Sequence, residues 1–120
     1  MENSKNVVLD GNVIHDFILW GIHGEKSSDI VVNNNVVNGI WPENEREPDY
    51  MKWAFMGGIA LQESKNYVIT NNIVASSWHF GFMLPGYQCG GTNINTGNVA
   101  HSISGYGMIV QPQENESATC

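Results

Sequence analysis

The residues best suited to contact a ligand in the first part of the chain are three close neighbours. His15 and Asp16 are adjacent and lie shortly before Trp20. An imidazole and a carboxylate can hydrogen-bond to sugar hydroxyls, and an indole face can stack on a sugar ring. We therefore take His15, Asp16 and Trp20 as a candidate sugar contact. Proximity in sequence alone does not make this His–Asp pair an acid–base couple.

A second candidate lies in residues 41–55, where four carboxylates alternate with other residues among four aromatic rings. Its rings Trp41, Tyr50 and Trp53 are the candidate ligand contacts. The alternative is a solvated acidic loop whose rings cover the flank of the fold. The alternating acids resemble calcium ligands, but the segment lacks the glycine and the terminal glutamate of a calcium-binding loop. We expect no cofactor, and calcium stays an open alternative.

Histidine and cysteine offer no metal site at a recognisable spacing. His15 and His101 each follow an asparagine by three residues, but they belong to different repeats. With two repeats between them, stacking would hold them about 14 Å apart, too far to share a metal. Cys89 and Cys120 lack metal-type spacing, so we expect no metal site.

The acidic residues do not form a catalytic pattern either. Enzymes that cleave polysaccharides bring two carboxylates together at the scissile bond. Asp10, Asp16 and Asp29 fall at different positions of the repeat described next, and no nucleophile–base motif is present. A non-catalytic role is favoured, while a carbohydrate-active enzyme remains the alternative.

The elements that hold these side chains follow from an asparagine repeat. An asparagine followed by a β-branched residue recurs at four places: Asn12-Val13, Asn35-Val36, Asn72-Ile73 and Asn98-Val99. The spacings are 23, 37 and 26 residues, which indicates coils of about 23 residues with 14 extra in the second. A fixed period of this length is typical of stacked repeats. The four asparagines are predicted to form a hydrogen-bonded amide ladder, and they also suit tight turns.

Each repeat contains three short apolar runs separated by turn residues, so the sequence predicts an all-β, right-handed parallel β-helix of about four coils. We place the coils near residues 4–26, 27–63 with the insertion at 41–55, 64–86 and 87–112, followed by a tail at 113–120. The whole chain is one domain. Four coils span only about 19 Å. Because solenoids need caps, we expect a fragment that stacks on neighbouring coils of a longer chain.

Composition excludes several classes of function. The net charge is −7 with only five basic residues, so we expect no nucleic-acid partner. A bare acidic polysaccharide would be repelled unless calcium bridged it. No run of 18 apolar residues is present, so this segment is not expected to insert into a membrane. A Cys89–Cys120 disulfide and glycosylation of Asn115 in Asn115-Glu116-Ser117 are candidate features of a secreted chain.

Parts of the repeat resemble a known extracellular family. Gly11-Asn12-Val13-Ile14-His15-Asp16, Pro85-Gly86-Tyr87-Gln88-Cys89 and Gly97-Asn98-Val99-Ala100-His101-Ser102 are similar to the β-helix repeats of fibrocystin and fibrocystin-L. Relatives with related repeats include hyaluronan-binding, cell-migration-inducing proteins. The acidic insertion departs from the family pattern. The resemblance implies the ectodomain of a large secreted or single-pass membrane protein, with Cys89 and Cys120 pinning the last coil.

Together these observations favour a non-catalytic extracellular module of a fibrocystin-like protein that binds a glycan or an extracellular protein. The alternatives are a carbohydrate-active enzyme fragment that depolymerises hyaluronan or another polysaccharide, and a purely structural spacer. The enzyme alternative predicts loss of polymer cleavage in Asp16→Asn.

Overall fold

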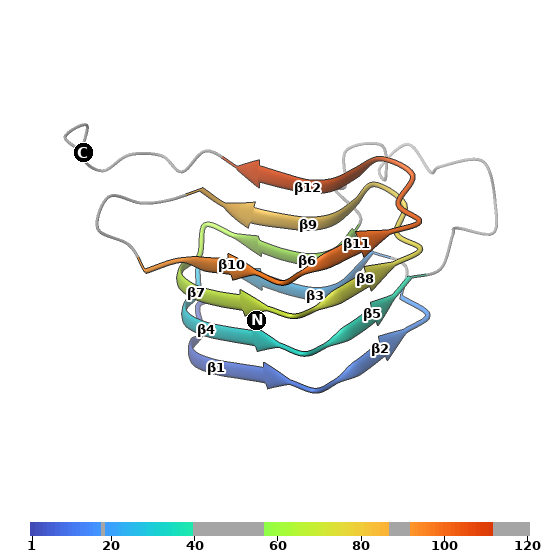
Figure 1. Ribbon diagram of the computed structural model, residues 1–120. Coiled ribbons are helices and arrows are strands. Elements are labelled where there is room, and N and C mark those ends of the chain that lie inside the picture. The colour runs from blue at the N-terminus through green and yellow to red at the C-terminus, as the bar shows by residue number, and fades with distance from the viewer. Residues whose placement is uncertain (18, 40–56, 87–91, 112–120) are drawn as a thin grey trace.

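The computed structural model describes residues 1–17, 19–39, 57–86 and 92–111. These residues form twelve strands and no helix. The strands make three four-stranded sheets, and each coil of the chain contributes one strand to every sheet (Figure 1). The described part of the chain is therefore a parallel β-helix.

Each sheet is built from every third strand of the chain. Sheet 1 contains β1 (Lys5–Asp10), β4 (Ser28–Asn33), β7 (Lys65–Thr70) and β10 (Ile94–Thr96). Sheet 2 contains β2 (Val13–His15), β5 (Val36–Asn38), β8 (Ile73–Ala75) and β11 (Val99–His101). Sheet 3 contains β3 (Trp20–Glu25), β6 (Gly57–Gln62), β9 (Phe80–Pro85) and β12 (Tyr106–Gln111).

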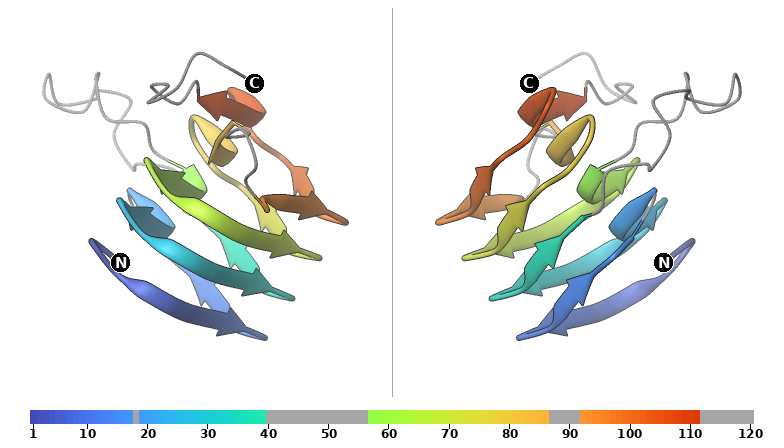
Figure 2. Two further views of the ribbon diagram at one scale, coloured as in Figure 1. Left: turned by 90° about the vertical axis from the view of Figure 1, so that its left-hand side faces the viewer. Right: turned by 90° about the vertical axis from the view of Figure 1, so that its right-hand side faces the viewer.

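All pairings within the sheets are parallel and keep one register from coil to coil. Val13 lies opposite Val36, which lies opposite Ile73, which in turn lies opposite Val99. The side views show the coils stacked directly above one another (Figure 2). Equivalent residues of successive coils therefore form straight columns, so a residue's place in the repeat fixes which neighbours it has.

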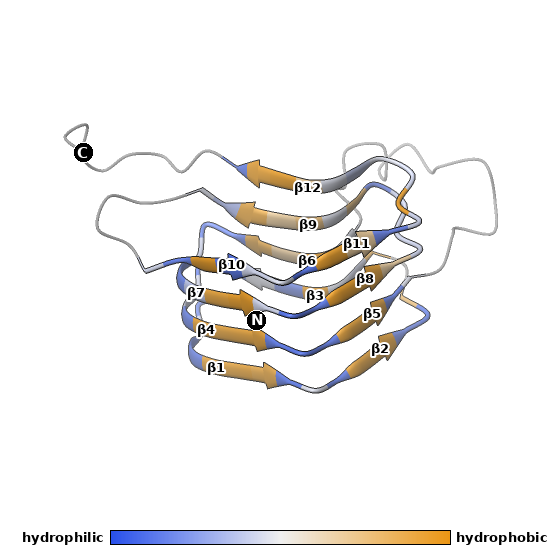
Figure 3. Cartoon of the chain, in the orientation of Figure 1, coloured by the Kyte–Doolittle hydropathy of each residue, from blue (hydrophilic) through white to orange (hydrophobic). Residues whose placement is uncertain are grey.

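The interior of the stack is a continuous apolar core. Its columns include Ile30, Val32 and Ile69 of sheet 1, Val37 and Val74 of sheet 2, and Ile59, Leu61, Phe82 and Leu84 of sheet 3. Figure 3 shows apolar strands alternating with polar corners. Apolar β-branched runs form the strands because they fit a pleated, buried surface. The short polar segments between them turn the chain.

The corners use left-handed backbone, again in columns. Gly11, Asn34, Asn71 and Gly97 occupy equivalent corner positions with φ of 68°, 54°, 55° and 69°. Asn6, Asp29 and Asn66 form a further left-handed column, with φ between 53° and 58°, at the second residue of β1, β4 and β7. Glycine, asparagine and aspartate tolerate this conformation best, which explains why the corners are rich in them.

The predicted all-β parallel helix is confirmed, and the predicted apolar runs fall inside the observed strands. The insertion at 41–55 lies outside the described residues.

Candidate functional site

The asparagine column is a directional hydrogen-bonded ladder. The Oδ1 atom of Asn35 accepts from both the backbone N–H and the Nδ2 of Asn12, each at 2.9 Å. Asn72 accepts the same pair from Asn35, and Asn98 accepts the same pair from Asn72. Asn35 and Asn72 are fully buried. Their amides satisfy backbone groups at the corner between sheets 1 and 2, so the two interior rungs are structural.

Each of these asparagines also donates a hydrogen bond to a backbone carbonyl of the preceding coil. Nδ2 of Asn35 donates to the Leu9 carbonyl oxygen, and Nδ2 of Asn72 donates to that of Val32. Nδ2 of Asn98 likewise donates to the Ile69 carbonyl oxygen, and its second hydrogen goes to Oδ1 of Asn95 at 2.7 Å, because no described coil lies above it. Asn95 thus takes the acceptor role that a further ladder asparagine would have.

A second ladder, which the sequence analysis did not identify, runs through Ser4, Ser27 and Ser64. The Ser27 hydroxyl accepts from the Ser4 backbone N–H, and the Ser64 hydroxyl accepts from that of Ser27. Each hydroxyl donates to a carbonyl two residues earlier in its own coil. The serine spacings of 23 and 37 match those of the asparagines, so the sequence held the signal.

His15 and Asp16 form an exposed pair at the corner that follows β2. Nδ1 of His15 lies 2.8 Å from Oδ2 of Asp16, and both side chains are about two-thirds exposed. Asp16 has a φ of 61°, so the left-handed turn at this residue holds its carboxylate beside the imidazole. The pair is presented to solvent in the first coil, where it can hydrogen-bond to a ligand.

Trp20 opens β3 on the far side of the same turn, and its ring stacks on His23. The ring centroids are 4.3 Å apart and the planes differ by 14°. Strict alternation would put residues 20 and 23 on opposite faces. Here Gly21 and Ile22 both face the core, since a Cβ on Gly21 would meet Val37 and Ile22 lies in the core cluster. Trp20 and His23 therefore share the outer face of sheet 3.

His23 was not identified from the sequence, because a local departure from alternation is not visible there. Its Nε2 is buried without a hydrogen-bond partner. Together with the pair at the corner, it gives the first coil an indole, two imidazoles and a carboxylate.

The aromatic column is not a continuous outer stripe. Trp20, Gly57, Phe80 and Tyr106 are register partners, as the repeat predicts. Phe80 is fully buried, Trp20 is half-buried, and Tyr106 is 69% exposed. The Phe80 ring lies over Gly57, where an added Cβ would come within 2.3 Å of it. Phe80 packs with Ala60 and Met83 in a separate apolar cluster, against which Trp20 and Ile109 also lie.

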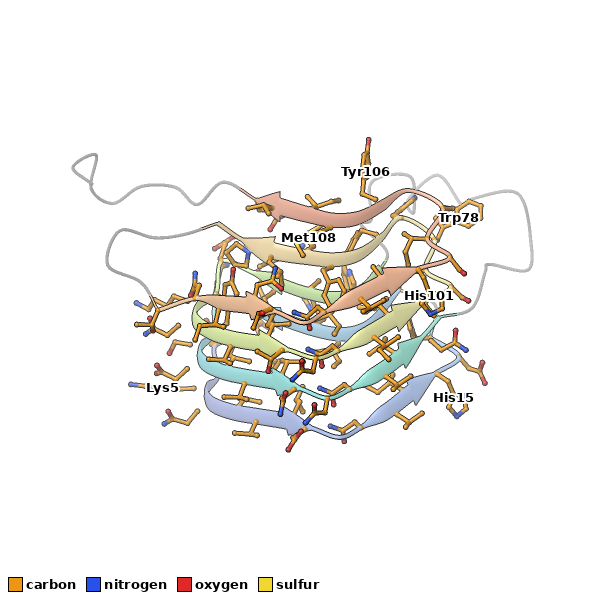
Figure 4. All side chains as sticks on the ribbon, in the orientation of Figure 1. Lys5, His15, Trp78, His101, Tyr106 and Met108 are labelled. Atoms are coloured by element: carbon orange, nitrogen blue, oxygen red, sulfur yellow. The ribbon has the colours of Figure 1, made fainter. Side chains whose placement is uncertain are left out.

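His15 and His101 occupy one column, with Asn38 and Ala75 between them. Figure 4 shows both on the same corner of the molecule, His15 near the first coil and His101 near the last. In the described part of the chain, no three His, Cys, Asp or Glu side chains lie close enough together to hold a metal ion.

Three of the described carboxylates, those of Asp10, Asp16 and Asp29, lie apart from one another. Asp10 accepts hydrogen bonds from Asn33 and Asn34 at one corner, and Asp29 lies 3.7 Å from the Lys5 ammonium at another. Asp16 is at a third corner. These three acids each make local polar contacts and do not face one another across a shared site.

Several candidates from the sequence lie outside the described residues: Trp41, Tyr50, Trp53, Cys89, Asn115 and Cys120. The structure does not bear on the proposed ring contacts, the disulfide or the glycosylation site. Among the residues described, no helix is long and apolar enough to cross a membrane.

Comparison with family models gives one match, to a right-handed β-helix region, over residues 1–119. The match covers nearly the whole chain and agrees with the handedness expected from the sequence. Searches of curated proteins and of solved structures gave no significant match.

Proposed function

Because the chain belongs to the right-handed β-helix family, we propose that it is a non-catalytic binding module that holds a neutral glycan at the first coil. The contact residues are His15, Asp16 and Trp20, and His23 supports the Trp20 ring by stacking on it. The observation that carries this proposal is the joint presence, in one coil, of a stacked indole–imidazole pair and an exposed imidazole–carboxylate pair.

These two pairs supply the two parts of sugar recognition. The indole offers an apolar face for a sugar ring, and the His15–Asp16 pair offers a donor and an acceptor for hydroxyl groups. The net charge of −7 disfavours a polyanionic ligand, because like charges repel at long range. A neutral glycan avoids that cost.

The wider context is a fibrocystin-like protein at the cell surface or outside the cell. Support for this part comes from the sequence: the similarity of the repeats, the two cysteines and the Asn115 sequon. In such a protein the module's coils would continue those of a longer chain. An extracellular protein partner is the other ligand class that this setting allows.

The test begins with a glycan array probed with the wild-type chain, with and without calcium. The best neutral hit is then titrated as a soluble monovalent glycan against Trp20→Ala and Asp16→Asn. Tyr106→Ala and His101→Ala are matched controls, since Tyr106 shares the column of Trp20 and His101 that of His15. The proposal requires weaker binding in the first pair of variants only. An array without hits would overturn it.

The His15–Asp16 contact also keeps the enzymatic alternative open to test. If the pair transfers protons, the wild-type chain should release new reducing ends from a bound polysaccharide, and Asp16→Asn should not. Binding without new reducing ends would support the non-catalytic module.

A further inference from the structure

A polar column on the outer face of sheet 2 continues from the His15–Asp16 pair into the second coil. His15 of β2 is the register partner of Asn38 of β5, so the two residues lie side by side in neighbouring coils (Figure 1). Both residues are exposed. Because parallel strands are about 4.8 Å apart, Asn38 is within reach of a ligand held at His15.

The backbone also holds Asn38 close to Asp16. The backbone N–H of Asp16 donates to the Asn38 carbonyl oxygen at 3.1 Å, and that of Gly39 donates to the Ala75 carbonyl oxygen at 3.0 Å. The parallel hydrogen bonding of sheet 2 therefore extends beyond the last residues of β2 and β5. It fixes the place of Asn38 relative to the His15–Asp16 pair.

The side-chain amide of Asn38 is available to a ligand. In the described part of the chain it makes no hydrogen bond to another residue, whereas the amides of Asn33 and Asn34 both donate to Asp10. A primary amide offers two donors and an acceptor, which suit the hydroxyl groups of a sugar. The Asn38 amide can make these bonds without first breaking bonds within the protein.

The same face offers apolar contacts beside the polar column. Val13 and Val36 are register partners that precede His15 and Asn38 by two residues, and they are 72% and 38% exposed. Side chains two residues apart in a strand point to the same face. Each of the two coils therefore presents one apolar and one polar side chain outward. This combination fits the C–H face and the hydroxyl edge of a sugar unit.

The polar column is interrupted after the second coil. The register partner of Asn38 in β8 is Ala75, which has no hydrogen-bonding side chain, and His101 lies one coil further on. The outer face of sheet 2 runs along the stack, so coils placed before β2 or after β11 would extend this face and would not cover it. The column therefore offers a ligand at His15 one further polar contact, Asn38.

We propose that Asn38 is a specificity-determining contact of the glycan site, and that the unit recognised is a disaccharide segment lying along the stack. One sugar lies on Trp20 and the His15–Asp16 pair. The next sugar is held by the Asn38 amide beside Val36. The coil spacing of about 4.8 Å is close to the length of one sugar unit in an extended glycan, so successive units meet successive coils. This inference rests on the proposed function and adds the size of the ligand.

The test is a calorimetric titration of soluble one-, two- and three-unit fragments of the best neutral glycan on the array. The wild-type chain should bind the two-unit fragment at least about fivefold more tightly than the one-unit fragment, and the three-unit fragment no more tightly than the two-unit fragment. Asn38→Ala should raise the dissociation constant of the two-unit fragment about fivefold and leave that of the one-unit fragment unchanged. His101→Ala, two coils further along the same column, is the matched control and should bind every fragment like the wild type.

Circular dichroism checks the fold of the variant. If Asn38→Ala does not fold, Asn38→Val takes its place, because valine suits a strand and also lacks the amide. The inference is overturned if one- and two-unit fragments bind the wild type alike, or if the folded variant changes both affinities equally. A loss of binding in Trp20→Ala would then still support the proposed function. If no fragment binds the wild type, the proposed function and this inference are both wrong.

Discussion

At the residue scale, the buried asparagines hold the corner between sheets 1 and 2 through both ends of their amides. Asn72 accepts two hydrogen bonds from Asn35 and donates to Val32 and Asn98. Asn12, in contrast, is exposed and is bonded by its ladder partner on one side only. The same residue type in the same column is therefore expected to contribute unequally to stability.

We expect Asn72→Ala to lower the free energy of unfolding by about 3 kcal/mol, because it leaves buried donors and acceptors without partners. Asn12→Ala should cost about 1 kcal/mol. Urea unfolding of the two variants and the wild type measures the difference. Equal losses would show that burial of the amide does not set its contribution.

Gly57 leaves room for the Phe80 ring, which packs closely against its backbone. A Cβ at this position would meet the ring of Phe80, whereas a Cβ at Gly11 would have nothing within 4 Å. We expect Gly57→Ala to destabilise the fold by about 1–3 kcal/mol through overpacking. Gly11→Ala is the control. Its added Cβ lies in open space, so the only loss of folding free energy is the strain of the left-handed backbone, about 1 kcal/mol.

The decisive comparison for Gly57 is a double-mutant cycle in urea. Trimming the ring with Phe80→Leu should make the added cost of Gly57→Ala smaller than it is in the wild-type background. If the two substitutions are additive, the ring does not cause the loss.

At the element scale, the side-chain direction within each short strand decides what a substitution costs. Ile69 in β7 points into the core and is fully buried, while Ile73 in β8 points outward and is 40% exposed. We expect Ile69→Ala to cost about 2–5 kcal/mol and Ile73→Ala less than half as much. Thermal or urea unfolding would contradict this assignment if the outward position were the more costly.

The strands and their register could be predicted because the repeated residue types have clear conformational preferences. Asparagine or glycine marks a left-handed corner, and a β-branched run marks the strand beside it. The serine ladder follows the same spacing and was equally available from the sequence. What the repeat does not encode is local irregularity, such as two successive residues of β3 facing the core, which places His23 against Trp20.

The sequence also could not predict how exposed each residue of a column is. Trp20, Phe80 and Tyr106 share one position of the repeat, yet they differ from fully buried to largely exposed. Exposure depends on how far a coil lies from the end of the stack and on what covers each sheet. For this reason the sequence could identify the candidate rings of the first coil, but it could not tell which rings solvent reaches.

At the scale of the whole molecule, stability should vary along the stack. Strands β6 and β9 are buried at nearly every position, whereas β1, β2, β10 and β11 at the two ends have exposed positions throughout. In a solenoid each coil is supported by its neighbours, so end coils open first. We expect amide hydrogen exchange to be slowest in β6 and β9 and fastest in the end coils. Uniform exchange would indicate a single cooperative unit.

The most direct test of the glycan-binding account is a calorimetric titration of a soluble neutral glycan into the wild-type chain and into Trp20→Ala. Loss of the indole face is expected to cost about 1.4 kcal/mol, a tenfold rise in the dissociation constant. Tyr106→Ala should bind like the wild type. Equal binding by wild type and Trp20→Ala, with Tyr106→Ala the weaker variant, would contradict a site in the first coil.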